Sequence, residues 1–539
     1  MLGDLYQAFG PRLFYFLIGA PIFIFLLSKI YLLRKRGMRN GLKKPPGPKG
    51  WPLIGNLLDM PTSNQYLTYM DWGKKYGDVV GVDICGRPIL ILNSRQAIHD
   101  LLIKRSAIYS NRPRMELLNT WGRWDWTLVL MQGSEEMHRQ RRMLGQCLNK
   151  GMIPRYHAAI QREALDFCLR LAKTPENYKE LIDHMSGANI MMITYGHKVK
   201  EEADENVERV HDVFSEFIKL GNAGSHIVDF FPALSALPSW VFGLDFAKTM
   251  KRLASLMDSS LIDPYFQGIR EIETGVAKSP SMLHTLLDAY TQDDGSVEHE
   301  RSIQAATGVA YLGIALIAGG DTTMITICTF LLAMMLYPDA QRKAKAEIDA
   351  LLKNERLPTF DDRKSLPYVE ATMNEVFRWK PTAPLAVAHQ STEDDVYNGM
   401  FIPAGTTIFP NTWACLQNED DFPEPDVFKP ERYLDGVKLK EGSVLAKEFA
   451  FGYGRRVCSG KHLADAIVWM NLSLLLAAFD ISLPTDRSGN PIMPDLDYEY
   501  GATTVHPKPF QCKISLRSEK YAELLRGSLN ASEGADRSN

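Results

Sequence analysis

The hydrophobic and polar positions along the chain change period several times, and these changes predict its elements. Two short apolar runs, Val79–Ile84 and Pro88–Leu92, suit the strands of a β-hairpin with Gly86 and Arg87 between them. From Gln96 to about Val387 the pattern is mainly helical. It is broken by expected loops at residues 111–132, 221–239 and 292–298. The chain therefore predicts a mainly α fold with a small β region.

The apolar run at residues 13–33 predicts a membrane anchor. As a helix, its 21 residues would span roughly 30 Å, the thickness of a bilayer core, and Lys29 is their only charge. Basic residues gather after this run, between Arg34 and Lys44. The asymmetry places residues 1–12 in the lumen and everything after residue 34 in the cytosol. A cleaved signal peptide has its basic cluster on the other side, so an uncleaved anchor fits better.

The segments that follow the apolar run predict the domain organisation. The proline-rich stretch Lys44–Gly50 indicates a stiff, non-helical connector, so residues 34–50 form a basic and proline-rich hinge. We expect one catalytic domain over residues 51–526. Residues 527–539 are small and polar and predict a disordered tail. Within the domain, the apolar side chains of residues 221–239 fit either core packing or a loop that dips into a membrane surface.

Composition excludes some classes of protein. Apolar residues make up 45% and charged residues 23%, as in ordinary globular proteins. The net charge of −3 gives no sign of a nucleic-acid partner. The seven cysteines are scattered and lack any CxxC pair, which argues against a disulfide framework or a zinc site and suits a reducing compartment.

One cysteine lies in an unusual setting. Residues Phe451–Gly460 read Phe-Gly-Tyr-Gly-Arg-Arg-Val-Cys-Ser-Gly, and their glycines permit backbone angles that a side chain blocks. An apolar helical run, Leu463–Phe479, comes next, so Cys458 is expected just ahead of a helix N-terminus. There the free N–H groups and the helix dipole stabilise a thiolate. A thiolate is a good axial ligand for haem iron. A buried, inert cysteine in a glycine-rich turn is the alternative.

These ten residues resemble the haem-binding loop of the cytochrome P-450 family, Phe-x-x-Gly-x-Arg-x-Cys-x-Gly, at every fixed position. Ser459 stands where many members have proline. The resemblance implies haem b with Cys458 as the axial ligand of its iron, and Phe451, Gly452 and Arg456 in the cofactor site. It also implies the fold of that family, preceded here by one transmembrane helix. The stretch Lys44–Asn56 is similar to the proline-rich hinge of microsomal members.

A second motif interrupts the long apolar helical pattern Ala310–Leu336. Residues 318–323 read Ala-Gly-Gly-Asp-Thr-Thr, and glycines inside a helix cost on the order of 1 kcal/mol each relative to alanine. Sequences accept such conflicts mainly at functional sites. A close crossing of two helices is the alternative, but it does not call for Asp321. The stretch is similar to the oxygen-binding segment of the P-450 long helix, which implies that Thr322, with Asp321, relays protons to dioxygen at the haem.

Two further motifs fit the family in order and spacing. Glu375 and Arg378 lie three residues apart on a predicted helix, which by itself indicates an everyday surface pair. Their position before Cys458, and the later Pro-Glu-Arg-Tyr that contains Arg432, resemble the Glu-x-x-Arg motif and its Pro-Glu-Arg-aromatic partner. The implied triad of Glu375, Arg378 and Arg432 is structural and locks the haem-loop region to the helix behind it.

The resemblance also implies cations for the haem propionates. Arg456 comes from the haem loop, and His389 precedes the family-like Ile402–Gly405 stretch. Arg141 matches the arginine of an early Trp-x-x-x-Arg motif in which Met137 replaces the tryptophan. That replacement removes one expected propionate donor.

Substrate contacts are expected from four stretches of the chain. By the resemblance they are Met115–Trp126, Ala315–Thr322, Pro381–Val387 and Gly501–Thr504. Trp121, Trp124 and Trp126 fit the lining of an apolar pocket or ordinary packing equally well.

These motifs cover residues 45–515, and the chain is identified as a member of the cytochrome P-450 family. The sequences of Tyr109–Pro113 and of the haem loop are similar to those of fungal members that oxidise secondary metabolites, the group that includes O-methylsterigmatocystin oxidoreductase. The implied reaction inserts one oxygen atom from O2 into an apolar terpenoid, polyketide or indole. The implied electron source is NADPH through cytochrome P-450 reductase, at the endoplasmic reticulum membrane. A haem-thiolate isomerase or dehydratase that acts without O2, and a non-catalytic haem sensor, remain as alternatives.

A basic patch is expected where the reductase docks. Flavoprotein reductases present an acidic face, and attraction between an acidic and a basic surface guides and accelerates the association of two proteins. The expected patch surrounds the haem loop and consists of Arg139, Arg142, Lys447, Arg455 and Lys461.

Overall fold

The computed structural model describes residues 42–200, 204–219, 227–230, 232–277, 281–315, 320–441, 446–500 and 503–538. The predicted lumenal segment 1–12 and the anchor at 13–33 lie outside these ranges. Within them, no single helix has the length and apolar character needed to cross a bilayer, and only the bent pair Thr322–Leu336 and Pro338–Leu352, at 105°, meets both criteria together.

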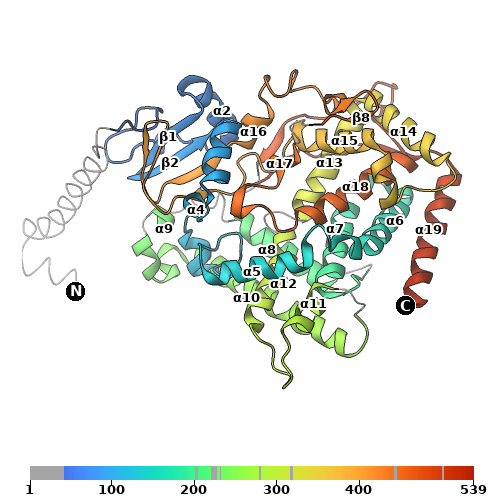
Figure 1. Ribbon diagram of the computed structural model, residues 1–539, viewed down its shortest axis with the longest axis horizontal. Helices are drawn as coiled ribbons and strands as arrows, with labels where there is room; N and C mark the ends of the chain where they lie inside the picture. Colours follow the sequence, from blue (N-terminus) through green and yellow to red (C-terminus); the bar gives the residue numbers. More distant parts are fainter. Residues whose placement is uncertain are drawn as a thin grey trace, which may run out of the picture. The chain divides into compact units, whose positions relative to one another are not determined.

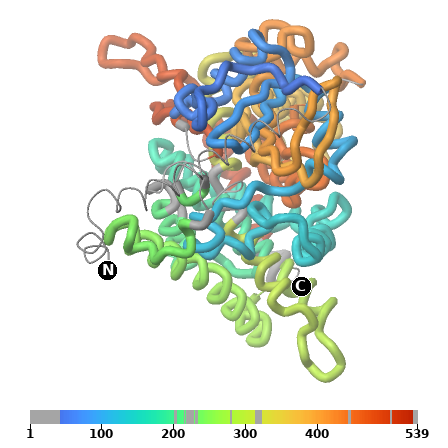
Figure 2. Tube along the Cα trace, turned by 90° about the vertical axis from the view of Figure 1, so that its left-hand side faces the viewer, coloured from blue at the N-terminus to red at the C-terminus, as the bar shows by residue number. Residues whose placement is uncertain are grey.

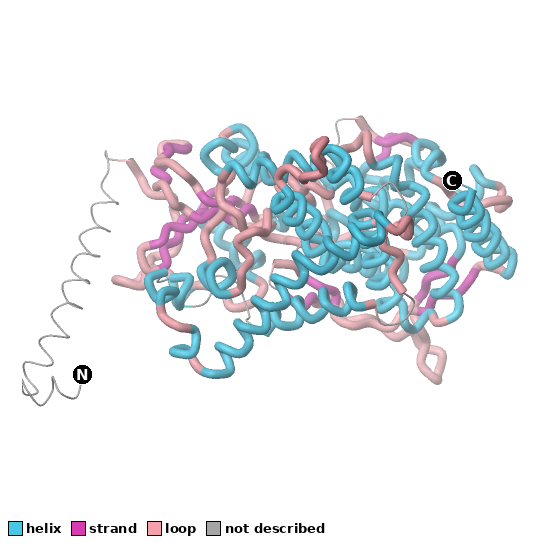
Figure 3. Tube along the Cα trace, turned by 90° about the horizontal axis from the view of Figure 1, so that it is seen from below, coloured by secondary structure: helices cyan, strands magenta, loops and turns pink. Residues whose placement is uncertain are grey.

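Helices dominate the described residues, and the strands are short (Figure 3), which confirms the mainly α prediction. Contacts divide the chain into two compact units where the sequence predicts one domain over residues 51–526. The smaller unit takes in Met1–Pro113 and Ala388–Asn411. The larger takes in Arg114–Val387 and Thr412–Asn539. Each unit is described by itself.

A four-stranded sheet forms the centre of the smaller unit. Its order is β1 (Val79–Ile84), β2 (Arg87–Leu92), β6 (Thr407–Pro410) and β3 (His389–Gln390), and only the β2–β6 pair is parallel. The predicted β1–β2 hairpin is confirmed, with Ile84 opposite Arg87. Its turn is therefore Cys85-Gly86, and both residues have positive φ (51° and 84°), as a tight two-residue hairpin requires. A second hairpin joins β4 (Asp395–Tyr397) to β5 (Met400–Ile402).

Short helices complete the smaller unit, and the predicted hinge packs on its sheet. The helices are η1 (Leu57–Asp59), α2 (Gln65–Tyr76), α3 (Arg95–Ile98), η2 (His99–Lys104) and α4 (Ser106–Tyr109). Residues 44–50 are non-helical, as expected, but they are not a free connector. The Gly81 N–H of β1 donates to the Pro46 carbonyl at 2.8 Å. A Cβ on Gly47 would lie 2.0 Å from the Gly81 carbonyl oxygen, so only glycine allows this approach.

The larger unit is mostly helical. Its first helices are η3 (Leu117–Trp121), α5 (Glu135–Leu148), η4 (Ile153–Tyr156), α6 (His157–Lys173), η5 (Pro175–Asn177), α7 (Tyr178–Tyr195), α8 (Glu205–Lys219), α9 (Ile227–Phe230), η6 (Pro232–Ala236), η7 (Ser239–Phe242), α10 (Leu244–Glu273) and α11 (Met282–Tyr290). Figure 2 shows α10, in green, along the outer edge of this unit. In the predicted loop at 221–239, Val228 is buried, whereas Trp240 just beyond it is 62% exposed.

The later part of the larger unit alternates core helices with short strands. The helices are α12 (Glu300–Ala315), α13 (Gly320–Leu336), α14 (Pro338–Leu352), η8 (Phe360–Ser365), α15 (Pro367–Trp379), α16 (Thr412–Leu416), η9 (Pro430–Tyr433), α17 (Lys447–Ala450), η10 (Gly454–Arg456), α18 (Lys461–Ala478) and α19 (Glu519–Ser538). The antiparallel strand pairs are β7 (Leu434–Asp435) with β8 (Lys438–Leu439), β9 (Phe479–Ser482) with β12 (Lys513–Leu516), and β10 (Tyr498–Tyr500) with β11 (Val505–Pro507).

The end of the chain corrects one prediction. Residues 527–538 continue α19, where the sequence predicts a disordered tail. Tyr521, Ala522 and Leu525 are buried in the first turns of this helix. Once such packing has formed the costly first turns, each further residue adds a hydrogen bond at little cost, so small and polar residues can continue the helix.

Helix α18 is the central support of the larger unit. Every residue from Ala466 to Ala478 is buried, and a helix that is apolar on all sides must be surrounded by others. It packs against α6, α13, α14 and α15 (Figure 1). Cys458 lies three residues before this helix begins, so the loop that carries it is attached directly to a buried core helix.

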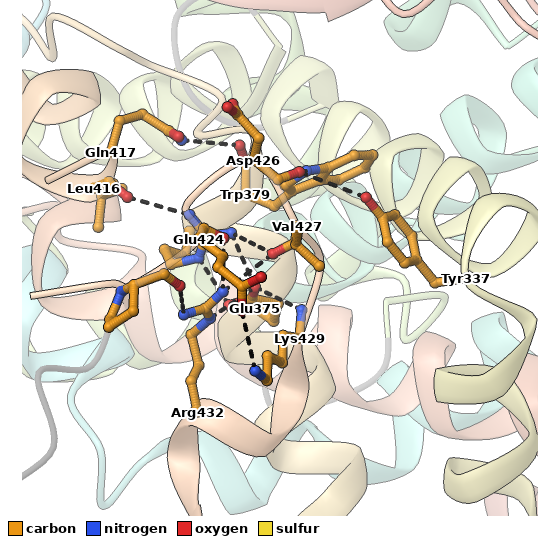
Figure 4. Close-up of polar contacts among 12 residues, drawn as sticks. Tyr337, Glu375, Trp379, Leu416, Gln417, Glu424, Asp426, Val427, Lys429 and Arg432 are labelled. Carbon is orange, nitrogen blue, oxygen red and sulfur yellow. Dashed lines mark hydrogen bonds and ion pairs between the residues drawn. The ribbon is translucent and has the colours of Figure 1, made fainter. Parts of the chain in front are cut away.

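A buried ionic network attaches residues 416–433 to α15 (Figure 4). Glu375 and Arg378 are both fully buried. Arg378 donates to Glu375 through Nε at 2.8 Å and Nη2 at 2.9 Å. Arg432 Nε donates to the same carboxylate at 3.0 Å. The structure therefore brings together the three residues of the predicted triad.

Backbone groups complete this network. Arg378 also donates to the carbonyls of Leu416 and Val427, each at 3.2 Å. The Lys429 N–H donates to the Glu375 carboxylate at 2.8 Å. On the same helix, Phe377 packs edge-on against Phe451 of the haem loop, with ring centroids 5.6 Å apart. Helix α15 thus contacts both the 416–433 segment and the cysteine loop.

Replacing Glu375 with glutamine should destabilise the larger unit strongly. The change keeps the shape of the side chain but leaves the buried Arg378 without its anionic partner, a loss of about 3–5 kcal/mol in the free energy of unfolding. Denaturant unfolding followed by haem absorbance measures it. The control is Arg342→Gln, which removes an exposed pair with Asp339 and should leave the unfolding midpoint near the wild-type value. An unchanged midpoint for Glu375→Gln would contradict a structural role.

Candidate functional site

The cysteine loop Phe451–Gly460 is closed by its own backbone. The Cys458 N–H donates to the Phe451 carbonyl at 2.8 Å, and the Val457 N–H donates to the Gly454 carbonyl at 3.2 Å. Gly452 (φ 76°) and Gly454 (φ 55°) are in the left-handed region that favours glycine. The loop predicted from sequence, just ahead of a helix N-terminus, is therefore present, and its backbone conformation favours glycine at positions 452 and 454.

The protonation of Cys458 differs from the sequence-based expectation. Burial raises the pKa of its thiol above the ordinary value, and this outweighs the Gly460 N–H and the cations of Arg141 and Lys461, which lower it. The helix N-terminus alone therefore does not stabilise the thiolate. A bound metal cation deprotonates a thiol outright.

Two arginines lie close together at this loop. Arg456, which belongs to the loop and is buried, donates through Nη2 to the Met131 carbonyl at 2.8 Å and through Nη1 to the Leu128 carbonyl at 3.3 Å. Arg141, which is half-buried on α5, donates through Nη2 to the Val457 carbonyl at 2.9 Å. Burial and the charge of Arg141 lower the pKa of Arg456 to about 10. Two neighbouring cations, one of them buried, favour an anionic ligand, and the two carboxylates of haem have that charge.

Trp126 adds a hydrogen-bond donor that the sequence does not single out. Its indole N–H is buried and has no partner among the described residues, although buried polar groups are normally paired. The ring packs against α12, where a Cβ on Gly308 would lie 3.1 Å from it. Met137, which replaces the expected tryptophan donor, is buried on α5. The thiol, the two neighbouring cations and this N–H together suit a cofactor with one axial position and anionic substituents.

A single sulfur is a sufficient protein ligand only for a metal that already has other ligands. Across the described ranges, no group of three or more histidine, cysteine or acidic side chains is placed to hold a metal ion. A macrocycle that supplies its own nitrogens meets this condition, and the loop around Cys458 therefore fits haem.

His389 belongs to the smaller unit. It is buried on β3, and its Nδ1 lies 2.7 Å from the Tyr109 carbonyl oxygen. Arg112, which the sequence analysis does not assign to the site, is also buried there and donates through Nη1 to the Ala388 carbonyl at 2.7 Å. The signal for it was present, because a charged side chain between Asn111 and Pro113 is seldom buried without a specific role.

Three of the predicted substrate stretches are connected in the larger unit. The described part of helix α13 runs from Gly320 to Leu336, and Thr322 on it is half-buried, while the side chain of Asp321 lies outside the described part of the chain. Thr326 donates to the Thr322 carbonyl at 2.7 Å, and its hydroxyl is 3.4 Å from that of Thr382. The Val505 N–H donates to the Thr382 carbonyl at 2.9 Å. Residues near 322, 382 and 505 therefore meet, although they are far apart in sequence.

The tryptophans of the first predicted substrate stretch differ in their surroundings. Trp121 packs with Phe242 and Phe246, at centroid distances of 5.3 and 5.8 Å. Trp124 is 1% exposed. Their contacts favour the packing interpretation for these two residues, whereas Trp126 has the buried N–H described above.

The structure reduces the predicted basic patch. Arg139 is paired with Glu135 and Glu136, at 3.1 and 2.7 Å. Lys447 is paired with Glu370 at 3.0 Å and approaches Asp465 at 4.0 Å. Both were expected as free cations and are largely neutralised. For Arg142, Arg455 and Lys461, the described residues provide no ion pair.

Comparison with known proteins agrees with this geometry. The family profile described as Cytochrome P450 matches residues 45–514. The chain is 38% identical to "Cytochrome P450 monooxygenase COX2" of Coprinopsis cinerea, over 91% of this chain and 92% of that one. It is 36% identical to "Cytochrome P450 monooxygenase 208" of Postia placenta, over 94% and 96%.

The "Cytochrome P450 monooxygenase claR" of Ampulloclitocybe clavipes is a third relative, at 34% identity over 94% of this chain and 91% of its own. Members of this family are haem-thiolate enzymes that use O2, a redox partner and hydrophobic substrates. With its cysteine loop, its two neighbouring cations and these relatives, the chain belongs to the cytochrome P450 family and is a monooxygenase.

Proposed function

We propose that this enzyme inserts one oxygen atom from O2 into an apolar small molecule of fungal secondary metabolism, of terpenoid, polyketide or indole type. It takes electrons from NADPH through cytochrome P450 reductase. The observation that carries the proposal is the position of Cys458, three residues before the buried helix α18, on the same loop as the buried Arg456 and with Arg141 hydrogen-bonded to that loop. The fungal relatives, which are named as cytochrome P450 monooxygenases, support the reaction type.

The residues of the cysteine loop have distinct roles in this proposal. Cys458 would hold the haem iron through its sulfur, and Arg141, Arg456 and His389 would bind the haem carboxylates. Gly452 adopts the left-handed backbone conformation of the loop, and Phe451 packs edge-on against Phe377 of α15. When bound, haem would supply the chemistry that activates O2, with electrons from the reductase. The protein supplies a fixed sulfur and buried positive charge.

Proton delivery is assigned to Thr322 and Asp321 on α13. The Thr322 hydroxyl would hold a proton for the reaction, and Asp321 would replenish it. The hydrogen bond from Thr326 to the Thr322 carbonyl, and the contact of Thr326 with Thr382, keep this part of α13 in one position. A positioned acid accelerates a step that needs a proton by roughly 10²- to 10⁴-fold.

The proposed location is the endoplasmic reticulum membrane, with residues 13–33 as a single-pass anchor and the catalytic part facing the cytosol. The apolar run and the basic residues after it support this orientation. The reductase is membrane-bound in this scheme, and it meets the surface formed by Arg142, Arg455 and Lys461.

The test of the whole proposal is co-expression with a reductase. Cells that receive candidate terpenoids, polyketides or indoles should release a product that is heavier by one oxygen atom, and ¹⁸O2 should label it. An isomerised or dehydrated product without ¹⁸O would replace the monooxygenase reaction by one that needs no O2.

Replacing Cys458 with alanine should abolish the long-wavelength absorption band of the reduced, carbon-monoxide-bound enzyme, because that band requires thiolate ligation. The matched control is Cys147→Ala, which removes another buried cysteine, on α5, and should keep the band. If Cys458→Ala kept the band, the ligand would have to be another residue.

Replacing Thr322 with alanine should leave haem binding and NADPH consumption intact but lower the product formed per NADPH at least about tenfold, because proton delivery fails. Peroxide release should rise to match. Thr307→Ala is the control, since the Thr307 hydroxyl donates to the Ile303 carbonyl of its own helix α12 at 2.9 Å. Unchanged coupling in Thr322→Ala would make Thr322 a packing residue.

Reversing Arg142 and Lys461 to glutamate should slow transfer of the first electron by about ten-fold or more at low ionic strength, since charge complementarity steers association by roughly 10- to 10³-fold. The effect should shrink in high salt, because salt screens exposed charges. Stopped-flow reduction measures the rate. Arg139→Gln is the control and should change it little, because Arg139 is already paired. An equal effect of both changes would place the dock elsewhere.

A further inference from the structure

The smaller unit contains a cavity of about 390 Å³ that the oxidation reaction does not use. This volume is within the range of small-molecule sites, about 300–1,000 Å³. Its walls come from the proline-rich segment, from β1 and β2, and from the end of β5 and the turn after it. They include Pro45, Pro48, Val82, Ile89, Leu90 and Phe401.

The proline-rich segment is held in place as one wall of this cavity. The Gly81 N–H donates to the Pro46 carbonyl at 2.8 Å, and the Phe401 N–H donates to the Lys43 carbonyl at 2.9 Å. Residues 43–50 are thereby attached to two strands of the unit. The cavity is consequently a feature of the folded unit and does not depend on a loose linker.

Apart from Lys44, the hydrogen-bonding side chains of the wall are already engaged. Asn56 accepts from the Asp83 N–H at 3.0 Å and donates to the Pro48 carbonyl at 3.0 Å. Asp83 accepts from the Gly86 N–H at 2.7 Å, and Thr406 donates to the Pro403 carbonyl at 2.6 Å. What remains for a ligand is aliphatic and aromatic surface, which favours a hydrocarbon chain.

The mouth of the cavity is basic and lies next to exposed apolar residues. Lys44 lines it, and Lys43 and Lys49 are neighbours along the chain. All three are exposed, and the described residues offer none of them an ion pair. Trp51 and Leu58 are 59% and 70% exposed. Tryptophan beside lysine is typical of the boundary between water and lipid.

We propose that this cavity binds the acyl chain of an anionic membrane phospholipid, with the phosphate at Lys44. The proposal rests on the membrane anchor of the proposed function. The predicted anchor ends at Leu33, and the ten residues 34–43 can span at most about 35 Å. Lys44 is therefore tethered close to the membrane surface, and anionic headgroups there attract basic segments.

The test uses the full-length enzyme in nanodiscs of phosphatidylcholine and phosphatidylserine, in which the phosphatidylserine carries a photoreactive diazirine midway along one acyl chain. After illumination, mass spectrometry locates the labelled residues. We expect label within residues 45–56, 81–90 and 401–406, in addition to the anchor at 13–33. Label in the anchor is an internal control for membrane insertion.

Two variants examine the cavity and its mouth separately. Ile89→Trp fills the cavity and should remove its label, while the anchor stays labelled and the carbonyl band shows an intact fold. Lys44→Glu changes only an exposed side chain and should lower cavity labelling by roughly fivefold or more, because one basic residue at an anionic surface contributes that much. Its effect should be small when the diazirine lipid is phosphatidylcholine in neutral nanodiscs. Ile492→Trp, at an exposed position outside the cavity, is the control for Ile89→Trp.

Each outcome decides between the proposals. A labelled anchor with an unlabelled cavity overturns the lipid site and leaves the anchor standing. No label in either overturns both. Full labelling of Ile89→Trp, or displacement of the phospholipid by a soluble fatty acid at equal concentration, would also overturn the lipid site, and the latter would identify a different occupant.

Discussion

The buried carboxylate of Glu375 is the interaction on which the architecture around the cysteine loop depends. It accepts hydrogen bonds from Arg378, Arg432 and the Lys429 backbone, and its side chain is fully buried. A buried charge is tolerable only while its partners stay in place. Because of this network, the 416–433 segment cannot shift on α15 without breaking several buried interactions at once. Helix α15 in turn packs against Phe451 at the start of the loop.

The charged residues around Cys458 have different hydrogen-bond partners. Around Cys458 the structure gathers two cations, the half-buried Arg141 and the buried Arg456, which donate hydrogen bonds to backbone carbonyls. Carbonyl groups orient an arginine through its N–H groups. In the Glu375 network, by contrast, both arginines donate to one buried carboxylate. This contrast separates the part of the motif set that stabilises the fold from the part that binds haem.

The smaller unit shows how a segment that resembles a linker in sequence becomes structural. Lys44–Gly50 has the prolines of a stiff connector, and it is indeed non-helical. Its role is decided by Gly47 and Gly81, where the missing side chains let two backbones touch. The same contact forms a wall of the apolar cavity, so the proline-rich stretch is part of the folded unit.

The sequence by itself determined the fold class, the β1–β2 hairpin, the cysteine loop and the identity of the triad, because these follow from local periodicity and from motifs with fixed spacing. The tertiary structure decided which charges are free. The sequence predicts Arg139 and Lys447 as free docking cations, but in the folded protein both are paired with neighbouring carboxylates. The thiol of Cys458 has a raised pKa because the effect of burial outweighs that of the helix N-terminus. The tertiary structure also brought Thr326, Thr382 and Val505 together and continued α19 through residues 527–538. Electrostatics and packing depend on neighbours that are distant in sequence, and a local pattern contains no information about those neighbours.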